Sequence, residues 1–251
     1  MVVKYININS KFNFKPSVAC IGYFDGVHIG HQKLILETIK EAKKLNIAST
    51  IICFSPDPND IIYGTKNKHL TRLKDRLSIF ENLGIDNVVV FRFNNDFMRI
   101  TPTKFIINYL NKMNITKLIC GYDFHFGYKG KGGCRLLKEK GDFSLKVVPE
   151  YKYRGIKVSS TRIKESLSKG DFRLVYKLLG YNYHLMLKVK KSSKIGKKWL
   201  IELISSYKDS ILPIDGVYSS GFEVRKNSVF IYGPKPLKVG QAVLLEFSAY
   251  E

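Results

Sequence analysis

Two histidines, His28 and His31, flank a glycine in the segment Gly22-Tyr23-Phe24-Asp25-Gly26-Val27-His28-Ile29-Gly30-His31. The apolar run before them predicts a buried strand at 18–22, and the apolar spacing after them predicts a helix at 29–45. The first N–H groups of a helix lack intrahelical partners and the helix dipole is positive there, so this end binds anions. Because the two imidazoles lie one turn apart, both can donate to phosphate oxygens on one side. The segment therefore predicts a phosphate-binding loop.

Two other interpretations of His-x-Gly-His compete with phosphate binding. The bare pattern is equally typical of two surface histidines beside a turn. A zinc site would need further ligands, and the other histidines, His69, His125 and His184, are scattered, with no cysteine at ligand spacing. The histidines alone leave the first alternative open and disfavour the second.

Two further segments place phosphate-binding residue types at the ends of predicted elements. Gly121-Tyr122-Asp123-Phe124-His125-Phe126-Gly127, continued by Tyr128-Lys129-Gly130-Lys131-Gly132-Gly133, follows an apolar strand at 117–120. Ser159-Ser160-Thr161-Arg162 begins a predicted helix, where hydroxyl groups and an arginine fork can hold phosphate. Alone, Ser-Ser-Thr-Arg is more typical of a helix cap. Three such segments in this order favour a nucleotide-binding site.

With these segments the chain resembles the bacterial bifunctional riboflavin kinase/FMN adenylyltransferases, also called FAD synthetases. Four segments, all within residues 18–180, carry the resemblance: Gly22–His31, the turn Phe54-Ser55-Pro56-Asp57-Pro58, Gly121–Gly127 and Ser159–Ile163. The extended first segment is specific to this family, whereas the shorter elements are shared with other nucleotidyltransferases, such as cytidylyltransferases. The chain departs from the family at His125, where arginine is common, and at Lys129 and Lys131, which replace other basic residues.

The resemblance implies transfer of AMP from ATP to FMN, giving FAD and pyrophosphate, with Mg²⁺ held mainly by the ATP phosphates. The attacking FMN phosphate is largely dianionic at neutral pH, so no general base is required. The expected catalytic residues are His28, His31 and Arg162. The expected ATP-binding residues are Gly22, Tyr23, Phe24, Gly26, His28, His31, Ser159, Ser160, Thr161 and Arg162. The expected flavin-binding residues are Pro56, Pro58, Asp123, Phe124 and Phe126. Asp25 is expected to cap the turn of the loop.

Alternating strands and helices predict an α/β domain in which a parallel sheet carries helices on both faces. The expected strands are 18–22, 48–54, 87–92, 117–120 and 144–149. The expected helices are 29–45, 71–82, 102–112, 134–140, 160–169 and 171–179. Ligands of such sheets sit beyond the carboxyl ends of the strands. We therefore expect one cleft there, covered by the loops 55–69 and 122–133.

After Gly180 the pattern changes to short alternating runs, which predict a small β-rich, barrel-like domain. The expected strands are 183–189, 198–204, 216–224, 229–232 and 242–247. The domains are thus expected at 1–180 and 181–251, the second resembling a shortened riboflavin-kinase module. Its segment 192–203 lacks the Pro-Thr-Ala-Asn of a working kinase, the chain ends before the family's later elements would fit, and Glu246 is not assignable as the base that a neutral alcohol acceptor needs. We expect no riboflavin kinase activity.

Composition limits the remaining function classes. The chain has 251 residues and a net charge of +21, but the basic excess is spread almost in proportion to length, so we expect no nucleic-acid partner. No apolar run is long enough to span a membrane and no signal-peptide region is evident, so we expect a cytoplasmic protein without a membrane partner. The four cysteines, Cys20, Cys53, Cys120 and Cys134, are expected to be reduced packing residues.

Two rival functions stay open on sequence alone. A nucleotidyltransferase for another acceptor, such as a cytidylyltransferase, would keep the phosphate segments but would have no reason to carry the Asp123-Phe124 and Pro56–Pro58 elements. A non-enzymatic RNA-binding protein would use the positive charge without turnover, and its binding would fall steeply with salt.

Overall fold

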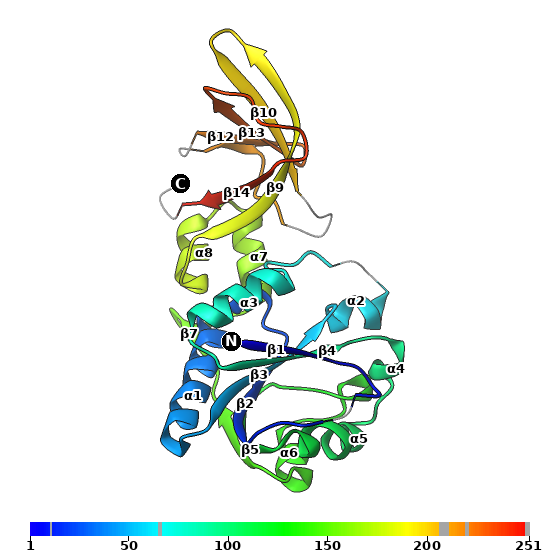
Figure 1. The fold of residues 1–251 in the computed structure, drawn as a ribbon. Helices are drawn as coiled ribbons and strands as arrows, with labels where there is room; N and C mark the ends of the chain where they lie inside the picture. The colour runs from blue at the N-terminus through cyan, green and yellow to red at the C-terminus, as the bar shows by residue number, and fades with distance from the viewer. Residues whose placement is uncertain (11, 65–66, 206–210, 219–220, 249–251) are drawn as a thin grey trace. The chain divides into compact units, whose positions relative to one another are not determined.

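The computed structural model describes residues 1–10, 12–64, 67–205, 211–218 and 221–248 (Figure 1). Contacts between residues divide the chain into two compact units. The first comprises Met1–Asn67 and Thr71–Lys157, and the second comprises Lys68–Leu70 and Val158–Glu251. Division of the sequence into modules at residue 180 stays a prediction.

The first unit is built on a six-stranded parallel sheet in the order β1-β4-β3-β2-β5-β6. Its strands are β1 Val2–Ile6, β2 Ser17–Ile21, β3 Ala48–Ser55, β4 Asn87–Arg92, β5 Ile115–Gly121 and β6 Ser144–Val148. The five expected strands are present. The edge strand β1 was not expected, because most of its side chains are exposed and its buried face gives no clear pattern.

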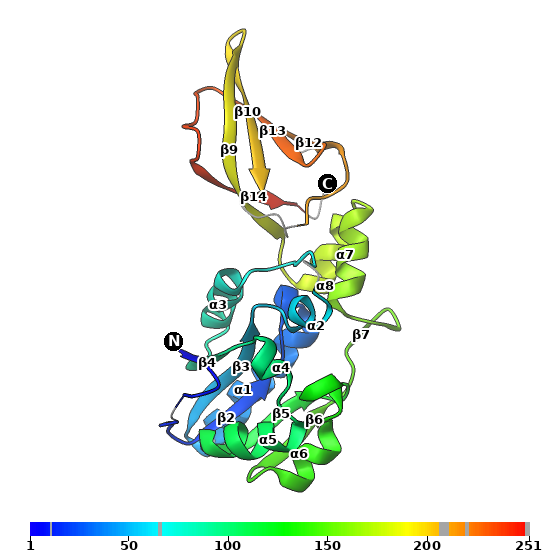
Figure 2. The ribbon, with the colours of Figure 1, turned by 90° about the vertical axis from the view of Figure 1, so that its right-hand side faces the viewer.

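Helices cover both faces of this sheet, as predicted (Figures 1 and 2). Successive side chains of a strand point to opposite faces, so Val18 and Cys20 of β2 pack on one side and Ala19 and Ile21 on the other. The first side carries α1 Ile29–Leu45 and α3 Leu73–Asn82, and the second carries α5 Pro102–Phe105 and α6 Cys134–Lys140. This parallel α/β layering is the expected fold class.

Several local elements differ from the expected ones. The predicted helix 102–112 is α5 followed by the π-helix Ile106–Leu110 and the short 3₁₀-helix Asn111–Met113. The expected loops contain the helix α2 Pro58–Tyr63 and the 3₁₀-helix Tyr128–Gly130. The additional elements are α4 Asn95–Met98, the 3₁₀-helix Asp25–Val27, and the hairpin of β7 Lys152–Tyr153 with β8 Ile156–Lys157. Such short elements carry too little periodicity to be seen in a sequence.

The second unit contains α7 Ser160–Ser168, α8 Phe172–Leu179 and a six-stranded antiparallel sheet in the order β11-β12-β13-β10-β9-β14. Its strands are β9 Tyr183–Ile195, β10 Lys198–Ser205, β11 Gly216–Tyr218, β12 Phe222–Arg225, β13 Ser228–Gly233 and β14 Ala242–Phe247. The expected strand 216–224 is two strands, and its residues 219–220 lie outside the described residues. Phe172 stacks on Phe247, with ring centroids 5.4 Å apart, which joins α8 to this sheet.

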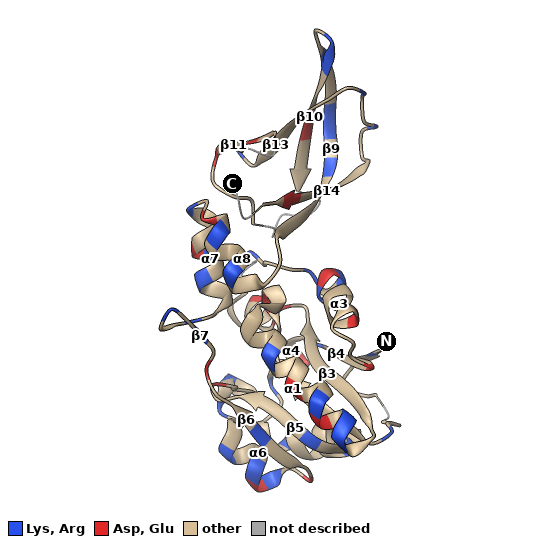
Figure 3. Cartoon of the chain, turned by 90° about the vertical axis from the view of Figure 1, so that its left-hand side faces the viewer, with Lys and Arg blue, Asp and Glu red and all other residues tan. Residues whose placement is uncertain are grey.

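Basic residues occur in both units, and three of the four cysteines are buried. Figure 3 shows Lys and Arg on helices and strands of both units, among them α6, α7 and β9. Cys20, Cys53 and Cys120 are buried, as expected, and burial raises the pKa of the Cys20 and Cys53 thiols to about 12. Among the described helices, none combines the length and apolar character that crossing a membrane requires.

Candidate active site

The loop between β2 and α1 has an unusual backbone. Phe24, Gly26 and Val27 have φ angles of 64°, 77° and 34°, a region that glycine adopts easily and that a β-branched residue adopts only under constraint. Thr71 supplies part of that constraint, because its hydroxyl accepts from the Gly26 N–H at 2.8 Å. The Thr71 N–H in turn donates to Oδ1 of Asp25 at 3.1 Å. Asp25 thus holds the loop, in line with the structural role expected for it, but through a residue far along the chain.

His28 ends this loop and begins the helix. Its Nδ1 accepts from the backbone N–H of His31 at 3.3 Å, which makes His28 the N-cap of α1. The two imidazole rings stack, with centroids 3.6 Å apart and planes 13° apart. Gly30 permits this arrangement, because a Cβ there would lie 3.3 Å from atoms of the His28 ring. The structure therefore brings the two predicted histidines together at the start of α1.

Burial disfavours the protonated form of both imidazoles. Burial lowers the pKa of His28 to about 4, with Asp25 acting in the opposite direction and Lys157 in the same one. Burial also lowers the pKa of His31, and the neighbouring His28 and Arg76 lower it further. Because Nδ1 of His28 is an acceptor, its proton sits on Nε2, which is then a donor. Among the described residues, the shielded Nδ1 of His31 has no hydrogen-bond partner.

Arg76 of α3 contacts the start of the same loop. Its Nη1 donates to the carbonyl oxygen of Tyr23, and its guanidinium lies 4.3 Å from the centroid of the Tyr23 ring. Phe24, the next residue, packs edge-on against His31 and Phe80. Side chains of α3 therefore hold Tyr23 and Phe24, two of the expected ATP-binding residues. A Cβ at Gly22, a third, would lie 3.1 Å from the Phe24 ring.

The expected flavin segment follows β5 and is tied to the β7–β8 hairpin. Asp123 forms an ion pair with Lys157, which raises the pKa of the Lys157 ammonium. The hydroxyl of Tyr122 donates to Glu150 at 2.9 Å. The imidazole Nδ1 of His125 lies 2.9 Å from the Asp123 carbonyl oxygen. Since Lys157 also lowers the pKa of His28, one ammonium is electrostatically coupled to both His28 and Asp123.

Two aromatic residues of this segment have different surroundings. The rings of Phe124 and Phe126 stack with centroids 5.5 Å apart, but Phe126 is buried in the core against Phe105 whereas Phe124 is only partly buried. Phe126 exchanges two backbone hydrogen bonds with Gly132, which closes the loop. Phe124 is thus the ring that a ligand can reach more easily, and Phe126 supports it.

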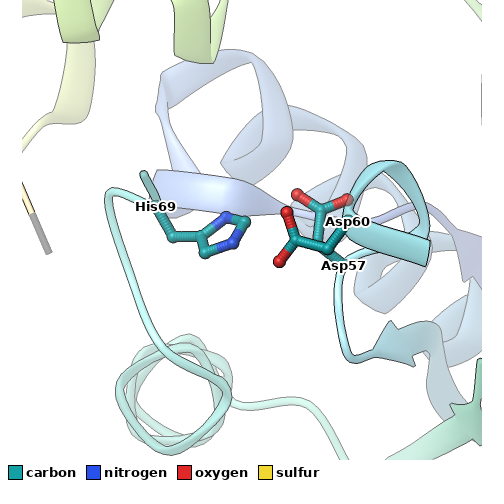
Figure 4. A group of neighbouring side chains, drawn as sticks. All are labelled: Asp57, Asp60 and His69. Atoms are coloured by element: carbon teal, nitrogen blue, oxygen red, sulfur yellow. The ribbon is translucent and has the colours of Figure 1, made fainter. Parts of the chain in front are cut away.

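The proline turn follows β3 in the same unit. Pro56 is exposed and Pro58 occupies the first turn of α2. Figure 4 draws the side chains of Asp57, Asp60 and His69. Asp57 caps α2 by accepting from the Asn59 N–H at 2.8 Å, and Asp60 accepts from the Asn67 N–H at 2.8 Å. Both carboxylates therefore have structural partners within the first unit.

The third predicted segment belongs to the second unit. Ser159 is the N-cap of α7, and its hydroxyl accepts from the Arg162 N–H at 3.3 Å. Ser160 and Arg162 are partly buried, and Thr161 is exposed. The segment therefore has the cap geometry that its residue types favour, with hydroxyl groups at the first turn of a nine-residue helix.

Sequence reasoning missed Thr71, Arg76 and Lys157. Thr71 and Lys157 follow no motif: Thr71 contacts the loop only through tertiary packing, and Lys157 acts on His28 only electrostatically. Arg76 does leave a signal, since it falls on the apolar stripe of α3 with Leu73, Leu77 and Phe80. A charged residue within such a stripe predicts a buried partner or a functional role.

The parallel sheet with helices on both faces and the paired histidines at the start of α1 define a nucleotidyltransferase-type domain. Residues 10–162 match the family model described as FAD synthetase. A bifunctional riboflavin kinase/FMN adenylyltransferase of Buchnera aphidicola subsp. Schizaphis graminum is 37% identical over 204 residues, which cover 78% of this chain and 65% of that protein. A Bacillus subtilis protein with the same name is 32% identical over 232 residues, covering 88% of this chain and 72% of the relative.

A solved structure described as a macrolide-efflux protein from Streptococcus pneumoniae has the same fold, with a TM-score of 0.81 and 24% identity. That similarity covers 97% of this chain and 89% of the other. The chain belongs to the FAD synthetase family.

Proposed function

We propose that this protein is an FMN adenylyltransferase, which transfers AMP from ATP to FMN and releases FAD and pyrophosphate. The observation that carries the proposal is the stacked, neutral His28–His31 pair at the start of α1, within a family whose relatives bear that activity in their names. The start of a helix with unpaired N–H groups attracts the phosphates, and the His28 Nε2–H adds a directed donor.

The proposed reaction is an in-line displacement. An oxygen of the FMN phosphate attacks the α-phosphorus of ATP, the bond to the bridging oxygen breaks, and pyrophosphate leaves with that electron pair. Because the attacking phosphate is already largely dianionic, the protein has to align the groups and stabilise the developing charge rather than remove a proton. A neutral imidazole can take part in this, since it still presents one N–H donor to a phosphate oxygen.

The remaining site residues keep their proposed roles. Ser160, Thr161 and Arg162 would bind the β- and γ-phosphates, whereas Asp123, Phe124, Pro56 and Pro58 would face the flavin. Mg²⁺ would enter with ATP and keep phosphate oxygens and water as its main ligands, as this ion usually does. Asp25, the carboxylate within the phosphate loop, is engaged by the Thr71 N–H, so we assign it no metal role.

We further propose that residues 181–251 do not phosphorylate riboflavin. A kinase must activate a neutral alcohol, and the segment 192–203 offers no Pro-Thr-Ala-Asn to hold nucleotide and metal. That segment instead forms the end of β9, a turn and the start of β10.

One experiment tests both proposals. The protein is incubated with ATP and Mg²⁺ together with either FMN or riboflavin, and the flavins are separated by chromatography. FMN is expected to give FAD and pyrophosphate, and riboflavin to give neither FMN nor FAD. Well-folded protein that makes no FAD from FMN would refute the transferase. FMN formed from riboflavin, and lost on removal of residues 181–251, would refute the second proposal. CTP in place of ATP, with other phosphorylated acceptors, tests the rival nucleotidyltransferase.

A further inference from the structure

Arg76 is a buried cation beside the phosphate loop. Its residue is only 2% exposed, and it lies on the face of α3 that packs against the sheet. Its contacts are one hydrogen bond from Nη1 to the Tyr23 carbonyl oxygen and the stacking of the guanidinium over the Tyr23 ring. Its Nε is buried and has no hydrogen-bond partner among the described residues.

No carboxylate within the described ranges forms an ion pair with Arg76. Asp25 and Asp57 lie within electrostatic range of Tyr23, but Asp25 is bonded to the Thr71 N–H and Asp57 caps α2. Burying an unpaired charge costs free energy of folding. Packing alone therefore does not account for an arginine at this position. In the first turn of α1, Nδ1 of His31 is a second shielded polar atom with no hydrogen-bond partner in the described part of the chain.

We propose that Arg76 is the positioning cation of the phosphate loop, whose buried charge is complemented by the phosphates of bound ATP. The inference rests on the proposed function and deepens it. Arg76 acts in two ways: it fixes the Tyr23 carbonyl oxygen and thereby the loop before His28, and it contributes a positive field at His31. That field also favours the neutral form of His31, because it disfavours a second positive charge nearby.

The test compares variants of one helix. Arg76→Met removes the charge and keeps an unbranched apolar side chain. Arg76→Lys keeps the charge but loses the planar guanidinium. Lys74→Met is the control, because it removes a charge from the exposed side of α3. Binding of Mg²⁺-ATP is measured by calorimetry, and stability is measured by thermal unfolding with and without Mg²⁺-ATP. These readouts do not require FAD formation, so they remain informative if the proposed reaction fails.

We expect Arg76→Met to unfold, without nucleotide, at the same temperature as the wild type or higher, and to bind Mg²⁺-ATP at least about tenfold more weakly. Lys74→Met should bind as the wild type does, and Arg76→Lys should fall between the two. The His31 pKa, followed by NMR, should rise in Arg76→Met. Wild-type ATP binding in Arg76→Met would overturn the proposal. Equal loss of binding in Arg76→Met and Arg76→Lys would also overturn it, because the charge would then not matter.

Discussion

The imidazole rings of His28 and His31 lie face to face, 3.6 Å apart between centroids, in surroundings that lower the pKa of both. Burial disfavours a proton on either ring, and two protonated rings at this distance would repel each other, so the neutral pair is favoured. His28 has two roles in this arrangement. Its Nδ1 accepts the hydrogen bond that caps α1, and its Nε2–H remains a donor for a ligand.

Loss of either imidazole should lower turnover far more than FMN affinity. A donor to the transferring phosphate acts mainly in the transition state, and removal of one such donor typically costs ~10²-fold or more. His28→Asn is the sharper variant, since asparagine is a good N-cap, whereas His28→Ala also loses about 1 kcal/mol of cap stability. Steady-state kinetics of His28→Asn and His31→Ala, with Lys40→Ala on the exposed side of α1 as control, check this. Wild-type turnover in both histidine variants would refute the phosphate role.

The stability of the first unit should depend on pH through His28. The folded-state pKa is lowered from 6.5 to about 4, so the unfolded chain binds more protons between these values. The stabilisation is therefore complete above about pH 6.5 and is lost as the pH falls toward 4, by at most about 3 kcal/mol. Urea unfolding from pH 7.5 to 4.5 measures the slope. His28→Asn should flatten it, and an equally steep slope in that variant would assign the effect to other groups.

Removal of the Asp123 carboxylate should weaken flavin binding and leave ATP binding nearly unchanged. Asp123 belongs to the segment proposed to face the flavin, and its ion pair with Lys157 is exposed enough to contribute little to stability. Asp123→Ala can be examined by quenching of FMN fluorescence and by ATP calorimetry on one preparation. If both affinities fell together with the unfolding temperature, Asp123 would be a structural residue.

Gly132 and Gly133 are adjacent but should respond differently to alanine. A Cβ at Gly132 would lie 2.7 Å from the Phe126 ring and 2.8 Å from Pro102, whereas at Gly133 the nearest atom is 4.0 Å away. Overpacking of this kind typically costs about 1–3 kcal/mol. We expect Gly132→Ala to lower the free energy of unfolding by that amount and to weaken FMN binding, and Gly133→Ala to cost less than about 1 kcal/mol. Equal stability of the two variants would contradict the contact.

Local sequence patterns were enough to predict the layered α/β fold and the position of the two histidines. Short-range periodicity sufficed for this, because α1 is an amphipathic helix with bounds 29–45 and β2 to β6 are apolar runs between polar turns. His28 and His31 could be placed at the helix start for the same reason, since three residues of helix bring them to one side. The cap formed by His28 follows from that local geometry.

The surroundings of those histidines, by contrast, depend on how distant parts of the chain pack. Their neutral state depends on burial, which arises when α3 and the β2–α1 loop pack on the sheet. Thr71 and Arg76 reach the loop across 45 and 53 positions of sequence, respectively, and no local pattern encodes such contacts. The ion pair of Asp123 with Lys157 is equally non-local. The local order of residue types determines which helices and strands form. The burial of the two histidines and the charges near them arise only when elements distant in sequence pack together and exclude water.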